Sequence, residues 1–201
     1  MKNQVSRNPL VFNCQTLGKL AMGIGVLSIT LYGCGSSGNK NTTANTVSKE
    51  VCLDSIKSLE AKLKTIQTPD ISLYNRAIDA YTRYANNFPD DTMAAACLFD
   101  AANISMSLSQ YQRAINFYDT VSTKYPNFKR AADCVFIRGF IYDDKLKDTA
   151  KARAMYQEVI DKYPHDTAIV TQARAAIAIL GKSYDEIIKG FEEKNKSQKK
   201  A

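Results

Sequence analysis

The chain is poor in the residues that most enzyme sites and β-sheets require. It has one histidine, no tryptophan, 9 glycines and 5 prolines among 201 residues. A β-rich chain of this length usually carries more glycine-containing turns and β-branched runs, so the composition favours helices. A single histidine leaves a histidine-based triad or zinc site without the partners that it needs. That histidine, His165, directly follows Pro164, where we expect a turn or the start of a helix.

Short motifs for catalysis or cofactor binding are also missing from the sequence. It contains no CxxC pair, no phosphate-binding loop and no GxGxxG fingerprint. Asp143, Asp144 and Asp148 are close together, but we expect them to be solvated acids at a helix end and in a loop. We therefore predict a protein that is not an enzyme and that binds no metal and no cofactor.

The charge pattern argues against nucleic-acid binding. The formal net charge is +7, and the C-terminal tail holds four lysines, Lys194, Lys196, Lys199 and Lys200. From residue 50 to residue 193 acids and bases are mixed along the chain, whereas a nucleic-acid binder gathers its lysines and arginines on one face. This pattern is typical of a solvated surface with a basic tail.

The N-terminal segment has the layout of an export signal. Lys2, Arg7 and Lys19 precede an uncharged run over residues 20–32 that is rich in apolar side chains. About 20 apolar residues are needed to span a membrane, so this run is too short for a span. Its length and basic flank suit the core of a secretory signal peptide.

The four residues that end this run, Leu31-Tyr32-Gly33-Cys34, resemble the lipobox of bacterial lipoproteins. The resemblance implies that residues 1–33 are removed, that the Cys34 thiol carries a diacylglycerol and that the new amine carries an acyl chain such as palmitate. Two or more acyl chains hold a protein stably on a membrane, whereas one holds it marginally. Two alternatives remain: an ordinary Cys34 after a conventional cleavage site, or an uncleaved anchor.

Residues 34–49 form a predicted tether between the lipid and the folded part. They are polar and poor in apolar side chains, which is typical of a flexible linker. By resemblance to Gram-negative sorting rules, Gly35 after the cysteine implies the outer membrane, on its periplasmic face. The predicted location is therefore the cell envelope.

Three proline motifs divide the remaining chain, 37 and 38 residues apart: Phe88-Pro89-Asp90, Tyr125-Pro126-Asn127 and Tyr163-Pro164-His165. Before each proline, apolar residues recur at spacings of three and four, which is one face of a helix that proline then ends. The shared positions hold Ala77, Ala114 and Ala152; Tyr81, Tyr118 and Tyr156; and Tyr84, Val121 and Val159.

A second helix is predicted after each proline. Its shared positions hold Ala94, Ala131 and Ile169; Leu98, Val135 and Ala173; and Ala102, Gly139 and Ile177. Small residues at the last of these positions let two helices approach closely. A further helix precedes the first copy, and a partial fourth copy follows with Tyr184, Ile187 and Phe191.

Paired helices with this alanine, tyrosine and proline pattern resemble tetratricopeptide repeats (TPRs) over about residues 50–193. The resemblance implies an all-α fold, an α-solenoid of about three to four antiparallel helix hairpins. The long repeat spacing and the Tyr-Pro endings are similar to BamD-type outer-membrane assembly lipoproteins and to periplasmic TPR proteins of the Tol-Pal system. Residues 194–201 are predicted to be a basic tail.

Cys97 and Cys134 occupy equivalent positions in consecutive copies. Equivalent residues on stacked helices lie about 8–10 Å apart, and a disulfide needs Cα atoms within about 7 Å. We therefore expect buried free thiols rather than a disulfide, and Cys52 has no evident mate.

In TPR families the concave side, lined by the first helix of each repeat, commonly receives a partner's peptide or helix. By resemblance, the positions facing that groove are Phe99, Asn103 and Met106 in one copy and Phe136, Phe140 and Asp143 in the next. Phe99 and Phe136 are either core aromatics between repeats or exposed anchors for a partner.

Two functions follow from these patterns. The first is a lipid-anchored scaffold that binds other envelope proteins through its concave face and assembles or maintains the envelope. The second is a lipoprotein that captures a small molecule or glycan for a transporter. The second requires a pocket with convergent polar groups, and the sequence alone reveals no such cluster.

Overall fold

The computed structural model describes residues 47–198. The predicted signal peptide, Cys34 and most of the predicted linker lie outside the described residues. No helix within the described range is long and apolar enough to cross a membrane.

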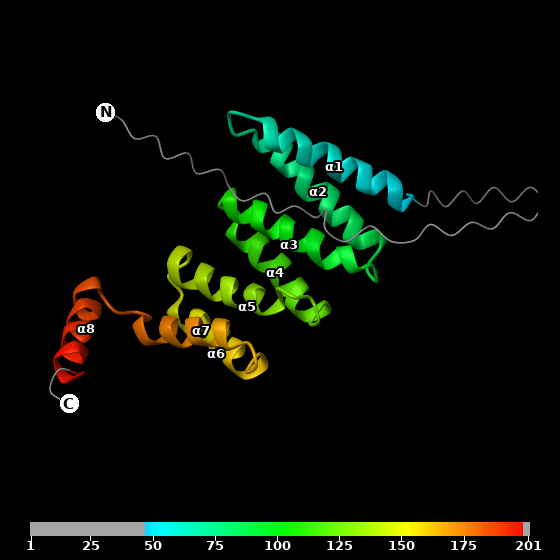
Figure 1. The fold of residues 1–201 in the computed structure, drawn as a ribbon. Coiled ribbons are helices and arrows are strands. Elements are labelled where there is room, and N and C mark those ends of the chain that lie inside the picture. The colour runs from blue at the N-terminus through cyan, green and yellow to red at the C-terminus, as the bar shows by residue number, and fades with distance from the viewer. Residues whose placement is uncertain (1–46, 199–201) are drawn as a thin grey trace, which may run out of the picture.

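The described residues form helices and no strands. In chain order these are α1 (Lys49–Thr65), α2 (Ile71–Asn87), α3 (Thr92–Ser107), α4 (Tyr111–Lys124), α5 (Ala131–Phe140), the π-helical turn η1 (Ile141–Lys145), α6 (Thr149–Lys162), α7 (Thr167–Ile179) and α8 (Tyr184–Gln198). Each helix from α1 to α6 packs on the next one, so consecutive antiparallel hairpins follow one another along an array (Figure 1). The predicted all-α, TPR-like solenoid is confirmed.

The three proline motifs separate successive hairpins in the same way each time. Phe88, Tyr125 and Tyr163 cap α2, α4 and α6, and their backbone N–H groups donate to the carbonyls of Tyr84, Val121 and Val159. The next residue is proline, which lacks the N–H group that another helical turn would need. The predicted helix ends are therefore confirmed.

The repeated positions form the core. Tyr81, Tyr118 and Tyr156 are 5%, 1% and 2% exposed, and the alanines and the Tyr84, Val121 and Val159 series are equally buried. These side chains fall into three consecutive apolar clusters, each shared by neighbouring helices. The 3-and-4 spacing thus identified the buried faces of α2, α4 and α6 correctly.

Gly139 permits close packing of α5 on α6. A Cβ atom at this position would lie 2.7 Å from Cε1 and 2.9 Å from Cδ1 of Tyr156. Because the Tyr156 ring is buried, it has no free space into which to move. The predicted need for a small residue at this position is met.

After Phe140, the chain enters a π-helical turn that the sequence did not predict. The Leu146 N–H donates to the Ile141 carbonyl at 3.0 Å, five residues back. An apolar spacing of three and four does not distinguish such a turn from an α-helix, so periodicity offered no signal for it.

The fourth copy is incomplete in a way that the sequence did not indicate. Helix α8 begins at a capping box, in which the Ser183 and Glu186 backbone N–H groups each donate to the other residue's side chain. It lies beyond the end of the array and does not run along α7 as α2 runs along α1 (Figure 1). It also continues to Gln198, past the predicted domain end at residue 193, because Glu192–Gln198 contains good helix formers and no glycine or proline.

Replacing Gly139 with alanine is expected to destabilise the protein. Overpacking against Tyr156 costs about 1–3 kcal/mol, which exceeds the gain of up to about 1 kcal/mol in helix propensity. The denaturation midpoint, followed by circular dichroism, should fall. Gly190→Ala is the matched control, because a Cβ at Gly190 meets nothing within 4 Å. If both variants raise the midpoint equally, the close contact does not exist.

Candidate partner-binding cavity

A cavity of about 870 Å³ lies between two successive proline turns. One wall is the turn from α2 to α3 with the first half of α3. The other is the turn from α4 to α5, residues 124–130. We call this space the inter-turn cavity.

The second turn is longer than its equivalents because it lacks a capping residue. Asp91 and Asp166, two residues after their prolines, accept backbone N–H bonds that start α3 and α7. The equivalent residue before α5 is Phe128, which has no side-chain acceptor. Helix α5 therefore begins only at Ala131, without a side-chain cap, and residues 125–130 form an extended turn that walls the cavity.

The floor of the cavity is apolar and aromatic. Phe99 is 4% exposed, and its ring packs edge-on against Tyr118 and tilted against Phe128, with centroids 5.7 and 6.1 Å away. The guanidinium of Arg130 lies 4.3 Å from the centre of the Phe99 ring. The small side chains of Ala95 and Ala96 complete this floor and leave the space above it open.

The two walls carry charges of opposite sign. The α2–α3 turn and α3 supply Asp90, Asp91 and Asp100, and the α4–α5 turn supplies Lys124, Lys129 and Arg130. The acidic and basic residues lie on different turns, far apart in the sequence. Sequence analysis therefore did not predict that they line one cavity.

Two of these charges are engaged within the protein. Asp91 pairs with Lys49, and it accepts the Met93 N–H at 2.7 Å. Burial opposes ionisation of Asp91, but these bonds outweigh it and lower the pKa of its carboxyl group. The Arg130 guanidinium donates to Asp133, its neighbour on α5, at 2.9 Å.

Asp100 is the most perturbed of these acids. Burial, followed by the nearby Glu60 carboxylate, raises its pKa to about 7, although Arg130 and a hydrogen bond with Asn103 act in the opposite direction. A carboxyl group of this kind changes charge near neutral pH.

The predicted groove residues do not all meet at this cavity. Phe99 lines it, but its ring is a buried core aromatic, so it is not an exposed anchor in this conformation. Asn103 accepts the Tyr118 hydroxyl at 2.7 Å, and Met106 packs in the same apolar cluster.

The residues predicted from the next copy lie elsewhere. Phe136 is half-buried against the Tyr156 ring, with centroids 5.2 Å apart. Phe140 is 40% exposed, and Asp143 is half-buried in η1. None of the three lines the inter-turn cavity.

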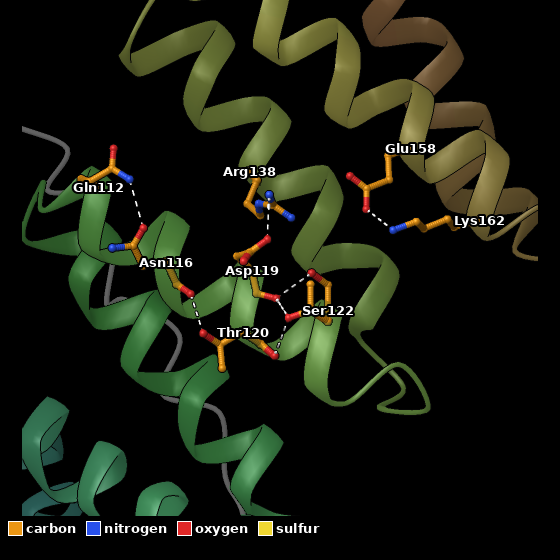
Figure 2. A network of polar contacts seen from close by, with 9 residues as sticks. Gln112, Asn116, Asp119, Thr120, Ser122, Arg138, Glu158 and Lys162 are labelled. Carbon is orange, nitrogen blue, oxygen red and sulfur yellow. Dashed lines mark hydrogen bonds and ion pairs between the residues drawn. The ribbon is translucent and has the colours of Figure 1, made fainter.

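An ion pair joins the helices on either side of the long turn. Arg138 of α5 contacts Asp119 of α4, with Nη2 and Oδ1 2.9 Å apart (Figure 2). The Arg138 side chain is only 12% exposed, so this pair is less screened by water than the surface pair Glu158–Lys162 on α6. The contact fixes α4 relative to α5, and thereby the two ends of residues 125–130.

The other residues with reactive side chains are three cysteines in the core and one histidine in a turn. Cys52, Cys97 and Cys134 are buried, and as expected no disulfide joins any of them to another described residue. Burial raises the pKa of the Cys134 thiol to about 12, which leaves it uncharged and unreactive at neutral pH. His165 is exposed in its turn, and the described residues contain no cluster of three potential metal ligands.

The comparisons with known proteins support one class. A tetratricopeptide repeat family model matches residues 133–166, which cover most of α5, all of η1 and α6, and the turn after α6. No curated protein and no solved structure matches the chain. The chain is thus a TPR-containing protein.

TPR domains generally bind protein partners, and the TPR fold is typically a non-catalytic scaffold. A protein–protein interaction scaffold is accordingly the function class that this repeat suggests.

Replacing Asp100 with asparagine is expected to stabilise the protein at pH 8. The folded-state pKa of about 7 lies above the ordinary value of 3.8, so the folded protein binds the proton more tightly than the unfolded one. Wild-type stability should therefore rise relative to Asp100→Asn as the pH falls from 8 to 4.

The gain from Asp100→Asn at pH 8 is at most about 4 kcal/mol, and less where water reaches the carboxylate. Thermal melts at both pH values measure it, with Asp54→Asn on the exposed side of α1 as the control. A melting-temperature difference that is the same at pH 4 and pH 8 would show that Asp100 has an ordinary pKa.

Proposed function

We propose that this protein is a lipid-anchored, periplasm-facing scaffold that binds a segment of another envelope protein in the inter-turn cavity. The observation that carries the proposal is the cavity itself, with its aromatic floor and charged walls. Binding pockets typically measure about 300–1,000 Å³ and combine apolar surface with a few convergent polar groups. A cavity of about 870 Å³ falls in that range.

A peptide segment suits the form of this site better than a globular surface does. The cavity is bounded by two turns and one helix, and Phe99, Ala95 and Ala96 line it from one face of α3. A few residues of the partner in an extended conformation would fill such a space, and the rest of the partner would stay outside the cavity. Recognition of peptide segments is a common mode for repeat proteins.

The proposed location rests on the N-terminal sequence. Leu31-Tyr32-Gly33-Cys34 supplies the lipidation motif, and residues 34–49 would hold the repeat domain at a distance from the membrane. A role in assembly or maintenance of the envelope, similar to that of BamD-type lipoproteins, is consistent with this arrangement.

A second candidate function gains support from the same cavity. Capture of a small molecule or glycan requires convergent polar groups, and Asp90, Asp100 and Lys129 supply them. The size of the cavity does not separate this function from peptide binding, so the experiment must do so.

Filling the cavity distinguishes the two candidates without disturbing the core. Ala96 is half-buried on the cavity floor, and a glutamine there occupies the open space without adding charge. Ala154, exposed on α6 and outside the cavity, provides the matched control variant Ala154→Gln. Both variants and the wild type are crosslinked in intact cells, and their protein adducts are identified by mass spectrometry.

The proposal predicts a specific protein adduct with the wild type and Ala154→Gln that is reduced at least about ten-fold with Ala96→Gln, equivalent to about 1.4 kcal/mol of binding. No specific adduct, together with a small molecule that co-purifies with the wild type and not with Ala96→Gln, would favour the capture function.

Replacing Cys34 with alanine tests the anchor. The variant lacks the thiol that would carry diacylglycerol, so it should leave the membrane fraction and appear among soluble proteins. Cell fractionation and immunoblotting measure the change, with Cys52→Ala as the control. If Cys34→Ala remains entirely in the membrane fraction, the lipoprotein proposal is wrong.

A further inference from the structure

We propose that the inter-turn cavity recognises an extended peptide through one lysine or arginine side chain, whose charge pairs with Asp100. The inference rests on the proposed function, because it names the chemistry of the segment that this scaffold binds.

One acidic group from outside α3 acts on Asp100. Glu60 of α1 is 6% exposed and accepts the Tyr81 hydroxyl of α2 at 2.8 Å, and its charge acts on Asp100. The negative charge of Glu60 thus adds to the effect of burial on the Asp100 carboxyl group. These charges favour the approach of a cation.

The remaining groups that act on Asp100 compensate the negative charge of its carboxylate only in part. Arg130 of the α4–α5 turn is the cation among them, and its guanidinium also bonds Asp133 at 2.9 Å. Asn103 hydrogen-bonds Asp100 from the same helix, and the Tyr118 hydroxyl of α4 is a neutral neighbour. An added positive charge would therefore find a favourable position beside Asp100.

The cavity floor fits the stem of a basic side chain. Lysine and arginine bury their methylene groups on apolar surface while the charged end remains among polar groups. Ala96, which is half-buried and one helical turn before Asp100, supplies that surface together with Ala95, while the Phe99 ring beneath is only 4% exposed. The contact of Arg130 with the Phe99 ring shows that this floor accepts a cation from within the protein.

The opposite wall limits how basic the peptide can be. Lys124 and Lys129 line the cavity on the α4–α5 turn, and no ion pair among the described residues includes them. They repel a second cation and attract an acidic neighbour. The expected segment therefore has mixed charge, with one basic residue flanked by neutral or acidic ones.

The titration of Asp100 gives the binding a pH dependence. Its pKa of about 7 in the free protein means that the carboxyl group is partly protonated at neutral pH. A bound cation favours the ionised form, so affinity should rise between pH 6 and pH 8. The limit is about ten-fold for each pH unit below the free pKa.

A peptide library tests the proposal while the partner is still unidentified. The probe is a positional-scanning library of acetylated, amidated octapeptides, and the protein is the full chain purified in detergent. We expect lysine and arginine at one position to be enriched at least about ten-fold over norleucine, the neutral side chain of similar length. Acidic residues should be favoured next to that position.

Two variants assign the preference to Asp100. Asp100→Asn should abolish the enrichment, and Glu158→Gln, at a half-buried acid on α6 outside the cavity, should retain it. Thermal melts exclude unfolding as the cause, since Asp100→Asn is expected to be at least as stable as the wild type. A library with no basic preference, or one whose preference survives Asp100→Asn, would overturn the proposal.

Competition with cadaverine, a free diamine, separates a peptide from a small amine. The proposal predicts that cadaverine competes far more weakly than the enriched peptide, and equal competition contradicts it.

Failure of the lysine or arginine preference can be distinguished from failure of the proposed scaffold function. If the cavity binds a peptide of another chemistry, the crosslinked partner is still lost with Ala96→Gln while the lysine preference is absent.

Discussion

The interaction on which the fold depends is the burial of each helix against its chain neighbours. No hairpin covers its own apolar face, and Tyr81, Tyr118 and Tyr156 are buried only because successive helices pack together. Proline stops the second helix of each of the first three pairs at the same place, so these hairpins stack in register. A helix at the end of such an array has a neighbour on one side only. Helix α8 does not supply the second neighbour for α7, because it extends beyond α7 without covering it.

The candidate site lies at the one proline junction of the three that lacks a capping aspartate. Where two junctions have a capping aspartate, the junction before α5 has Phe128, so the helix starts later and the turn lengthens. The longer turn carries Lys129 and Arg130 to face Asp100 on α3, and the Arg138–Asp119 pair fixes the helices on both sides of it. The absence of a side-chain cap lowers the stability of helix α5 and leaves a longer turn, which forms one wall of a polar, aromatic cavity.

The sequence predicted the repeats well because their signals are local. Proline positions and the 3-and-4 spacing fixed the helix ends and the buried tyrosines. The inter-turn cavity was not predicted: of the residues assigned to the concave groove only Phe99 lines it, and Phe136, Phe140 and Asp143 lie elsewhere. Its second wall comes from a turn some thirty residues away, and its charges meet only in three dimensions. The absence of an aspartate at residue 128 was the one local signal that pointed to it.

The central claim is that a partner protein binds between the two proline turns of adjacent hairpins. Hydrogen–deuterium exchange of the protein with and without its crosslinked partner tests this claim most directly. The account predicts new protection of amides in residues 89–100 and 124–130, with little change in α6 and α7. Protection confined to η1 and α7, with both turns unaffected, would contradict it.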